Sequence, residues 1–435
     1  MQTAFRSLRR LRTLGWARVA VATVVVLLGT GSVALAAKHG HKPKHHGGSS
    51  ISSQTWGAAH GQAVNLYTLK NSHGMIVKIT NYGGVVQSIW VPDRTGRLRN
   101  VSLGFPKLSD YVNDFENQPW PAAGGSGDTY FGAIIGRYAN RIADASFTLN
   151  GTLYGLGGGA NSCGTATHPN NGPNLLHGGL LSYNTQVWTA TPKKLSNGVA
   201  LQLSYTDPNC YNGFPGTVTT VVTYTLLQSN ALQIAYHATT SAPTVINYTN
   251  HTYFNLAGEG SGTIYDQKLA INSNQFQPTN TVQIPTGFAS VSGTPFDFRA
   301  MKPIGRDIGD ASAPQGNQLV VAHGYDHNWV LRGSGFRLGA VAQDPGDGIV
   351  LWTYTNQPGV QLYTGNFLVG DLVGTSGHAY RQGDAFTLET QHYPDSPHHI
   401  GDPQWPSVVL NPGQVFNSKT TYKFTTAGPG FRHNF

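Results

Sequence analysis

The chain has 435 residues, of which only 11% are charged, and a formal net charge of +8. Eight of its 28 Lys and Arg residues precede Gly47, where no acidic residue occurs, so the remainder balances 20 basic against 20 acidic residues. The basic overall balance is therefore no evidence for nucleic-acid binding. Because charges are few, the surface must be polar mainly through Ser, Thr, Asn and Gly.

The first residues have the pattern of an export signal. Basic residues precede an apolar run over 19–28, and the run gives way to small residues that end in the A-x-A site Ala34-Leu35-Ala36. We expect a cleaved signal peptide over residues 1–36, a secreted or extracytoplasmic mature protein, and no membrane attachment after cleavage. The alternative is a retained signal anchor, because 19–37 approaches the roughly 20 apolar residues that span a bilayer, but Gly29 to Ser32 interrupt it.

A biased tract rich in His, Lys, Gly and Ser follows at residues 37–51. Its core, KHGHKPKHH, contains four histidines that could hold a metal loosely. Nothing nearby sets a coordination geometry, so we interpret the tract as a solvated linker without a function of its own.

The rest of the chain reads as an all-β domain. Apolar and polar residues alternate in short stretches bounded by turn residues, most clearly over 199–205, 217–227 and 231–239. Helical periodicity is scarce, and residues 108–114 can form a turn or two. The chain also contains 54 glycines and 24 prolines, which favour turns between strands. Together these features predict a large antiparallel β-sandwich.

The two cysteines, Cys163 and Cys210, lie in Gly- and Asn-rich loops. Two free buried thiols are one reading. Since an exported chain meets an oxidising compartment, we predict instead that they form a disulfide.

Two strings far apart carry residues suited to acid/base chemistry. NHTYFNLAG contains His251, and LETQHYPDSPH contains Glu389, each among aromatic, amide and proline residues. On a strand, Glu389 shares a face with Thr387 and Gln391. Opening a cyclic hemiacetal needs one group to give a proton to one oxygen and another to take a proton from the second, and His and Glu are usual choices near neutral pH. A satisfied core histidine and a solvated strand carboxylate are the structural alternatives.

Further motifs lie before and between these two strings, namely TNYGG, VPDRTGR, GRYANRI, NLLHGG, IPTG, GYDHNWVL and QPGVQLYTGNFL. The set, in this order, resembles the aldose 1-epimerase (galactose mutarotase) family from about Trp56 to Phe424. The resemblance implies one galactose mutarotase-like β-sandwich domain over 52–435, an isomerase that interconverts the α and β anomers of a free aldose of the glucose or galactose type.

The resemblance also implies roles for individual residues. Glu389 matches the general base and His251 the general acid, and the substrate-binding positions correspond to Arg141, His177, Asp326 and Gln361, with Asn140 beside Arg141. Taken singly, Arg141 could be part of a structural ion pair and Asp326 could cap a turn. Cationic, anionic and amide groups together suit sugar hydroxyls, which both donate and accept hydrogen bonds.

Other functions fit the sequence less well. We expect no metal and no cofactor, since HExxH, paired CxxC, an EF-hand loop and a P-loop are all missing from the sequence. A glycosidase usually needs two carboxylates, and an epimerase of sugar phosphates would need a basic cluster. The leading alternative is a secreted carbohydrate-binding protein on the same scaffold without turnover. The sequence does not indicate an oligomeric state.

Overall fold

The computed structural model describes residues 48–117, 128–312 and 316–435. The predicted signal peptide and most of the predicted linker lie outside these ranges. Within them the chain is built mainly of antiparallel strands, as predicted, and no helix in these ranges is long and apolar enough to cross a bilayer. The helices are α1 (Leu108–Asn117), α2 (Gly316–Val321) and the short 3-10 turns η1 (Ala143–Ala145), η2 (Tyr183–Thr185), η3 (Tyr211–Gly213), η4 (Ile304–Arg306) and η5 (Ser396–His399).

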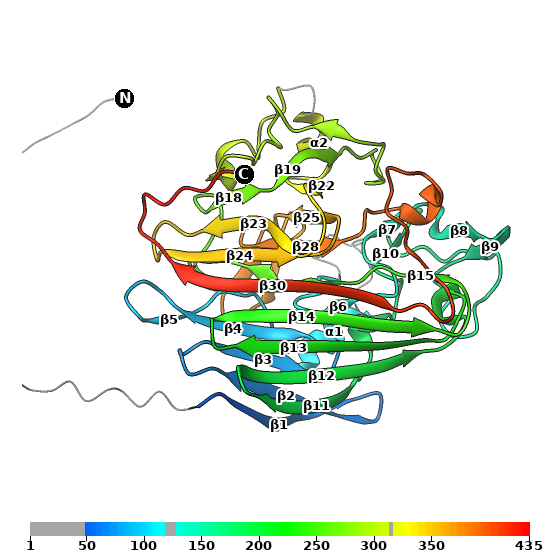
Figure 1. The fold of residues 1–435 in the computed structure, drawn as a ribbon, viewed down its shortest axis with the longest axis horizontal. Coiled ribbons are helices and arrows are strands. Elements are labelled where there is room, and N and C mark those ends of the chain that lie inside the picture. The colour runs from blue at the N-terminus through cyan, green and yellow to red at the C-terminus, as the bar shows by residue number, and fades with distance from the viewer. Residues whose placement is uncertain (1–47, 118–127, 313–315) are drawn as a thin grey trace, which may run out of the picture. The chain divides into compact units, whose positions relative to one another are not determined.

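A nine-stranded sheet crosses the molecule (Figure 1). Three of its strands were predicted from alternation alone, and the observed strands agree with those predictions to within two residues at either end. In spatial order the sheet contains β11 (Thr189–Leu195), β12 (Gly198–Asp207), β13 (Val218–Leu227), β14 (Ala231–Thr240), β30 (Phe416–Thr426), β24 (Ile349–Thr355), β23 (Arg337–Gln343), β18 (Lys268–Ile271) and β21 (Lys302–Pro303).

Two further sheets lie against its apolar face. The five-stranded sheet is a meander of β1 (Ser50–Ala59), β2 (Gln62–Lys70), β3 (Ile76–Thr80), β4 (Val86–Pro92) and β5 (Leu98–Asn100). The six-stranded sheet has the order β17 (Tyr253–Phe254), β28 (Phe386–Gln391), β25 (Gly359–Tyr363), β22 (Asp326–Leu331), β19 (Ser273–Gln277) and β20 (Ala289–Ser290).

Short two-stranded ribbons connect the sheets and frame the site described below. They pair β6 (Ile134–Ile135) with β16 (Thr249–Asn250), β7 (Arg141–Ile142) with β10 (Leu175–Leu176), β8 (Ser146–Leu149) with β9 (Thr152–Gly155), β15 (Thr244–Val245) with β29 (Val409–Leu410), and β26 (Val369–Val373) with β27 (Ala379–Arg381).

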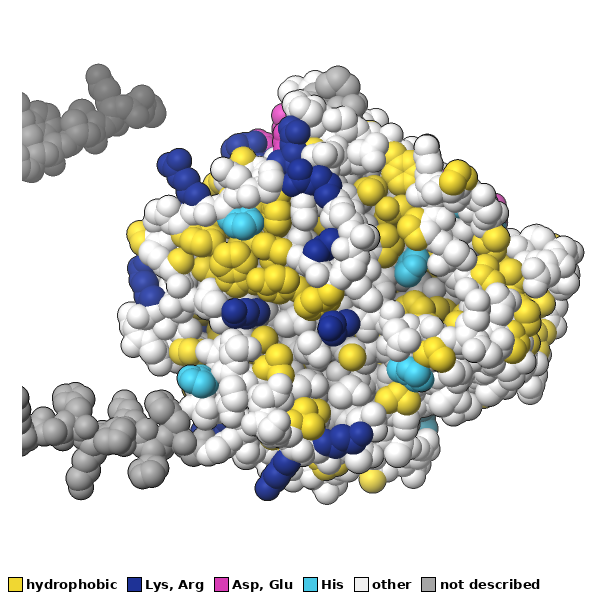
Figure 2. Space-filling model, in the orientation of Figure 1, with side chains coloured by type: hydrophobic (Ala, Val, Ile, Leu, Met, Phe, Trp, Pro, Cys, Tyr) yellow, Lys and Arg dark blue, Asp and Glu magenta, His cyan; other side chains and the backbone are white. Residues whose placement is uncertain are grey.

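The largest core lies where the three sheets meet. Leu201 and Val222 come from the nine-stranded sheet, Ile79 from the five-stranded sheet, and Leu362 and Leu388 from the six-stranded sheet, and all five are buried in one cluster. Burial of this much apolar surface is the main favourable term in folding. The face of the molecule shown in Figure 2 is largely uncharged, as the composition led us to expect.

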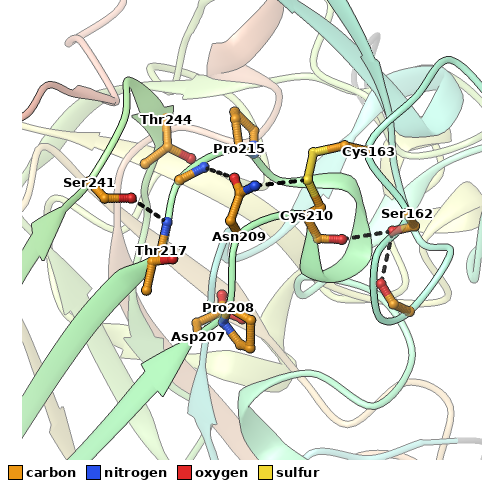
Figure 3. The surroundings of a disulfide bond; sticks show 12 residues. Ser162, Cys163, Asp207, Pro208, Asn209, Cys210, Pro215, Thr217, Ser241 and Thr244 are labelled. Carbon is orange, nitrogen blue, oxygen red and sulfur yellow. Dashed lines mark hydrogen bonds between the residues drawn. A yellow bond between two sulfur atoms is a disulfide. The ribbon is translucent and has the colours of Figure 1, made fainter.

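The disulfide prediction is confirmed. Cys163 and Cys210 are bonded, with their Cα atoms 4.6 Å apart, within the usual range for a disulfide. Beside the bond, the Asn209 amide donates to Cys210 Sγ at 3.1 Å and accepts from the Gly216 backbone N–H at 2.7 Å (Figure 3). The bond joins two loops separated by 47 residues of sequence.

Candidate active site

Glu389 is placed by the centre of the six-stranded sheet. It lies on β28 opposite Gln361 on β25, which in turn lies opposite Asn328 on β22. As alternation predicted, Leu388 points into the apolar core while Thr387 shares the face of Glu389, and the Thr387 hydroxyl donates to Glu389 Oε1 at 2.9 Å. The carboxylate is therefore held by regular strand pairing at a buried position.

His251 approaches Glu389 from the link between β16 and β17. Its backbone N–H donates to Ala133 O and its carbonyl accepts from Gly132 N–H, both at 3.0 Å, so the β6–β16 ribbon holds the residue at both sides. The ring lies with Nε2 3.4 Å from Glu389 Oε1, and Nδ1 has no hydrogen-bond partner in the part of the chain that the structure describes. Tyr253 packs against the ring with centroids 5.0 Å apart.

His177 and Arg141 reach the same place from the β7–β10 ribbon. The Asn140 backbone N–H donates to His177 Nδ1 at 3.1 Å, and the His177 N–H donates to Asn140 O at 3.1 Å. Gly178 completes the turn, because a Cβ there would lie 2.3 Å from Gly136 O. The His177 ring meets that of His251 edge to face at 5.2 Å.

Asp326, at the start of β22, faces Arg141. The Arg141 Nη2 and Asp326 Oδ2 atoms are 3.7 Å apart, and Gln361 donates to Asp326 Oδ1 at 2.7 Å. Arg141 Nε donates to Asn171 Oδ1 at 2.9 Å. The guanidinium and the carboxylate are both almost fully buried, which is costly unless such groups are paired and hydrogen-bonded.

These side chains line one pocket, which is partly open to solvent. Six of the seven predicted site residues line it, namely Glu389, His251, Arg141, His177, Asp326 and Asn140. Gln361 lies behind the wall and contacts Asp326 rather than the pocket. A concave pocket with a few convergent polar groups is typical of a small-molecule site.

Aromatic side chains form part of the pocket wall and were not among the predicted site residues. Tyr130, Tyr253, Tyr363 and Phe367 also line the pocket. Tyr253 stands two residues after His251 in NHTYFNL, and Tyr363 lies opposite both Asp326 and Thr387 in the sheet. Tyr253 and Tyr363 lie within the motifs that carry His251 and Gln361, so the aromatic residues of those motifs were candidates for the pocket wall. Tyr130 lies in none of the motifs.

Burial keeps the two central groups neutral. It raises the pKa of Glu389 to about 8, with a further rise from the Asp326 carboxylate. It lowers the pKa of His251 to about 3. The pKa of His177 is also well below its usual value, through burial first and then through His251 and Arg141. Strongly shifted pKa values of several neighbouring groups in one pocket are typical of acid/base sites.

The donor set bears on metal binding. His177, His251 and Glu389 each place one ligand-type atom within 4.8 Å of the others. However, His177 Nδ1 accepts the Asn140 N–H, so the neutral ring carries its proton on Nε2. A metal-binding histidine needs a lone pair on the atom facing the ion and donates from the other. His177 is thus arranged to donate a hydrogen bond into the pocket, and the absence of a metal stays a prediction.

Comparison with known proteins agrees with this geometry. The aldose 1-epimerase family matches residues 65–423. Galactose mutarotase of Bos taurus is 41% identical over 81% of this chain and 91% of its own length. Aldose 1-epimerase of Escherichia coli K12 is 35% identical over 84% of this chain and 97% of its own length. The crystal structure of galactose 1-epimerase from Lactobacillus acidophilus superposes with a TM-score of 0.71 at 25% identity, covering 87% of this chain and 99% of that one.

The fold and the pocket therefore define a carbohydrate isomerase of the galactose mutarotase-like class. The chain belongs to the aldose 1-epimerase family, whose reaction is the interconversion of the α and β anomers of an aldose.

Proposed function

We propose that this protein interconverts the anomers of a free glucose- or galactose-type aldose in the pocket, and that Glu389 and His251 make the two proton transfers. The observation that carries the proposal is the contact between His251 Nε2 and Glu389 Oε1 at 3.4 Å inside a buried pocket. The two oxygens of a pyranose hemiacetal are bonded to one carbon, so an acid and a base this close can reach both.

In the ring-opening step Glu389 takes the proton of the anomeric hydroxyl while His251 gives one to the ring oxygen. The bond from the anomeric carbon to the ring oxygen breaks, and an open-chain aldehyde forms. After rotation about the adjacent carbon–carbon bond the hydroxyl attacks the other face, and the two residues exchange roles. Protons and electrons balance without a co-reactant.

The pKa values of Glu389 and His251 indicate which of the two side chains carries their shared proton before the reaction. With Glu389 near 8 and His251 near 3, the pair holds one proton, on Glu389, between these values. The step above starts after that proton has moved to His251 across the 3.4 Å contact. The guanidinium of Arg141 lowers the pKa of Glu389 and so favours the ionised carboxylate that this transfer produces.

The remaining polar side chains would bind the sugar. Arg141 and Asp326 offer a cationic donor and an anionic acceptor on one wall, and His177 offers its Nε2 proton beside His251. Asn140 holds His177 through its backbone, and Gln361 holds Asp326. Tyr130 and Tyr253 supply aromatic surface for the apolar C–H faces of a pyranose.

Polarimetry tests the assignment. Freshly dissolved α-glucose or α-galactose should reach anomeric equilibrium faster with the protein than without it, and the Glu389→Gln variant should lose this acceleration. A protein that binds either sugar but does not accelerate equilibration would be the carbohydrate-binding alternative, and this proposal would then be wrong.

We also propose that the protein is exported. The proposal is supported by the leader pattern and by the disulfide between Cys163 and Cys210, because such bonds persist mainly in oxidising compartments. The mature chain should begin after Ala36. N-terminal sequencing of secreted protein tests this, and an intact leader in the membrane fraction would indicate a signal anchor instead.

A further inference from the structure

Gln283 stands between the two charged residues of the sugar-binding wall. It lies in the loop between β19 and β20, outside every motif that identified the site. Its side-chain amide donates from Nε2 to Asp326 Oδ2 at 2.9 Å, and its Oε1 accepts from Arg141 Nη2. One amide thus bridges a buried guanidinium and a buried carboxylate.

The bridge replaces a direct ion pair. Arg141 Nη2 and Asp326 Oδ2 are 3.7 Å apart, whereas a charge-assisted hydrogen bond between such groups is about 2.7 to 2.9 Å long. Both oxygens of Asp326 are held by amides, Oδ1 by Gln361 and Oδ2 by Gln283. Gln283 is partly exposed and is not part of the pocket lining, so it acts on the pocket through Arg141 and Asp326.

We propose that Gln283 is a positioning residue for the sugar: its amide keeps Arg141 and Asp326 from closing into a direct pair and so leaves both free to bind sugar hydroxyls. This inference rests on the proposed function of the pocket. Without the bridge, the 3.7 Å separation would shorten by about 0.8 Å to a direct hydrogen bond. The guanidinium and the carboxylate would then hydrogen-bond to each other and lie farther from the sugar hydroxyls that they bind. Displacements of this size in an active site weaken binding and slow reactions.

The backbone of the loop does not depend on the Gln283 side chain. Asn280 Oδ1 accepts from the N–H groups of Val282 and Ile284, both at 3.0 Å, and Asn174 Nδ2 donates to Val282 O at 2.9 Å. Gln283 has φ 62°, a left-handed conformation that Asn adopts more readily than most residues. Gln283→Asn therefore keeps the turn while shortening the amide by one methylene, so that it no longer reaches both partners.

The test uses purified full-length protein and the Gln283→Asn variant, with Val282→Ala as the matched control because Val282 is an exposed neighbour on the same loop. For Gln283→Asn we expect KM for galactose to rise about tenfold, kcat to change less than twofold and Tm to stay unchanged. Val282→Ala should match the wild type in all three. An unchanged KM, or a fall in kcat alone, would overturn the proposal, as would a matching rise of KM in Val282→Ala.

Direct binding separates this inference from the proposed function. Calorimetric titration with galactose should show the same tenfold weakening in Gln283→Asn without requiring turnover. A wild type that binds galactose but does not accelerate mutarotation would refute the proposed function alone. In an Arg141→Lys background, Gln283→Asn should weaken binding by less than twofold, because both changes act through the same wall. A full tenfold effect in that background would refute the positioning role.

Discussion

The nine-stranded and six-stranded sheets show the same alternation but treat their polar faces differently. Along β13, buried residues such as Val222 and Tyr224 alternate with partly exposed threonines. Along β28 and β25 every residue is buried, including Thr387, Glu389, Gln391 and Gln361. The nine-stranded sheet has one solvent-exposed face, whereas the polar face of the six-stranded sheet is covered by the segments that carry His177, His251 and Gln283.

The covered polar face of the six-stranded sheet carries a continuous row of unpaired polar atoms. Among the described residues, no hydrogen-bond partner exists for Glu389 Oε2, Gln361 Oε1, Asn328 Oδ1 and Gln277 Nε2. These atoms follow one row across β28, β25, β22 and β19. Buried polar groups without partners cost stability. Both sheets contribute to the shared apolar core, but this polar row on the six-stranded sheet lowers the stability that its own apolar face provides.

The largest expected effect is on turnover. Glu389→Gln keeps the shape of the side chain but removes its basicity, so kcat should fall by roughly 10² to 10⁴ while sugar binding largely survives. His251→Asn should behave similarly. Polarimetric rates with galactose provide the measurement, and Gln233→Glu on β14, a partly exposed position, is the control. Near-normal rates in Glu389→Gln would refute the proposed base.

The nine-stranded sheet should show the opposite response. Leu201→Ala removes a fully buried side chain from the shared core, and such changes cost about 2 to 5 kcal/mol of unfolding free energy. Below the new melting temperature its kcat should match the wild type. Urea unfolding and polarimetry on the same preparation test both statements. A large loss of kcat in still-folded protein would mean that this sheet is not only a scaffold.

Stability should depend on pH through Glu389. Its pKa is about 8 in the folded protein and 4.5 as a free side chain. Between these values the unfolded chain releases the proton and the folded chain keeps it, so stability falls as pH rises from about 4.5 to about 8. Glu389→Gln lacks this loss. Its Tm should exceed that of the wild type by a margin that grows over this interval and then stays constant; a constant difference from pH 4.5 to 9 would contradict the raised pKa.

The smallest effect concerns Gln391, whose amide nitrogen and oxygen are both buried without partners beside Glu389 on β28. Gln391→Met keeps the length of the side chain and removes the unpaired groups, so the unfolding free energy should rise by about 1 kcal/mol. Thr223→Val on β13, at a partly exposed position, should change it by less than 0.5 kcal/mol, as is usual at a surface. A destabilised Gln391→Met would indicate that the amide binds buried water.

The sequence by itself determined the sheet-rich fold and the strands over 199–205, 217–227 and 231–239, because alternation reflects a local rule about which side chains face a core. It also identified the proposed catalytic pair and its neighbours, because each lies in a short motif that matches a family. Neither kind of information describes how separate motifs meet.

Only the tertiary structure decided the rest. It brought His251 within 3.4 Å of Glu389, although 138 positions separate them in the sequence, placed Gln361 behind Asp326 instead of in the pocket, and inserted Gln283 between Arg141 and Asp326. The covering of the polar face of β28 was equally invisible to alternation. The physical reason is that hydrogen bonding and desolvation depend on distances between segments far apart in the chain, and these distances exist only once the sheets have packed.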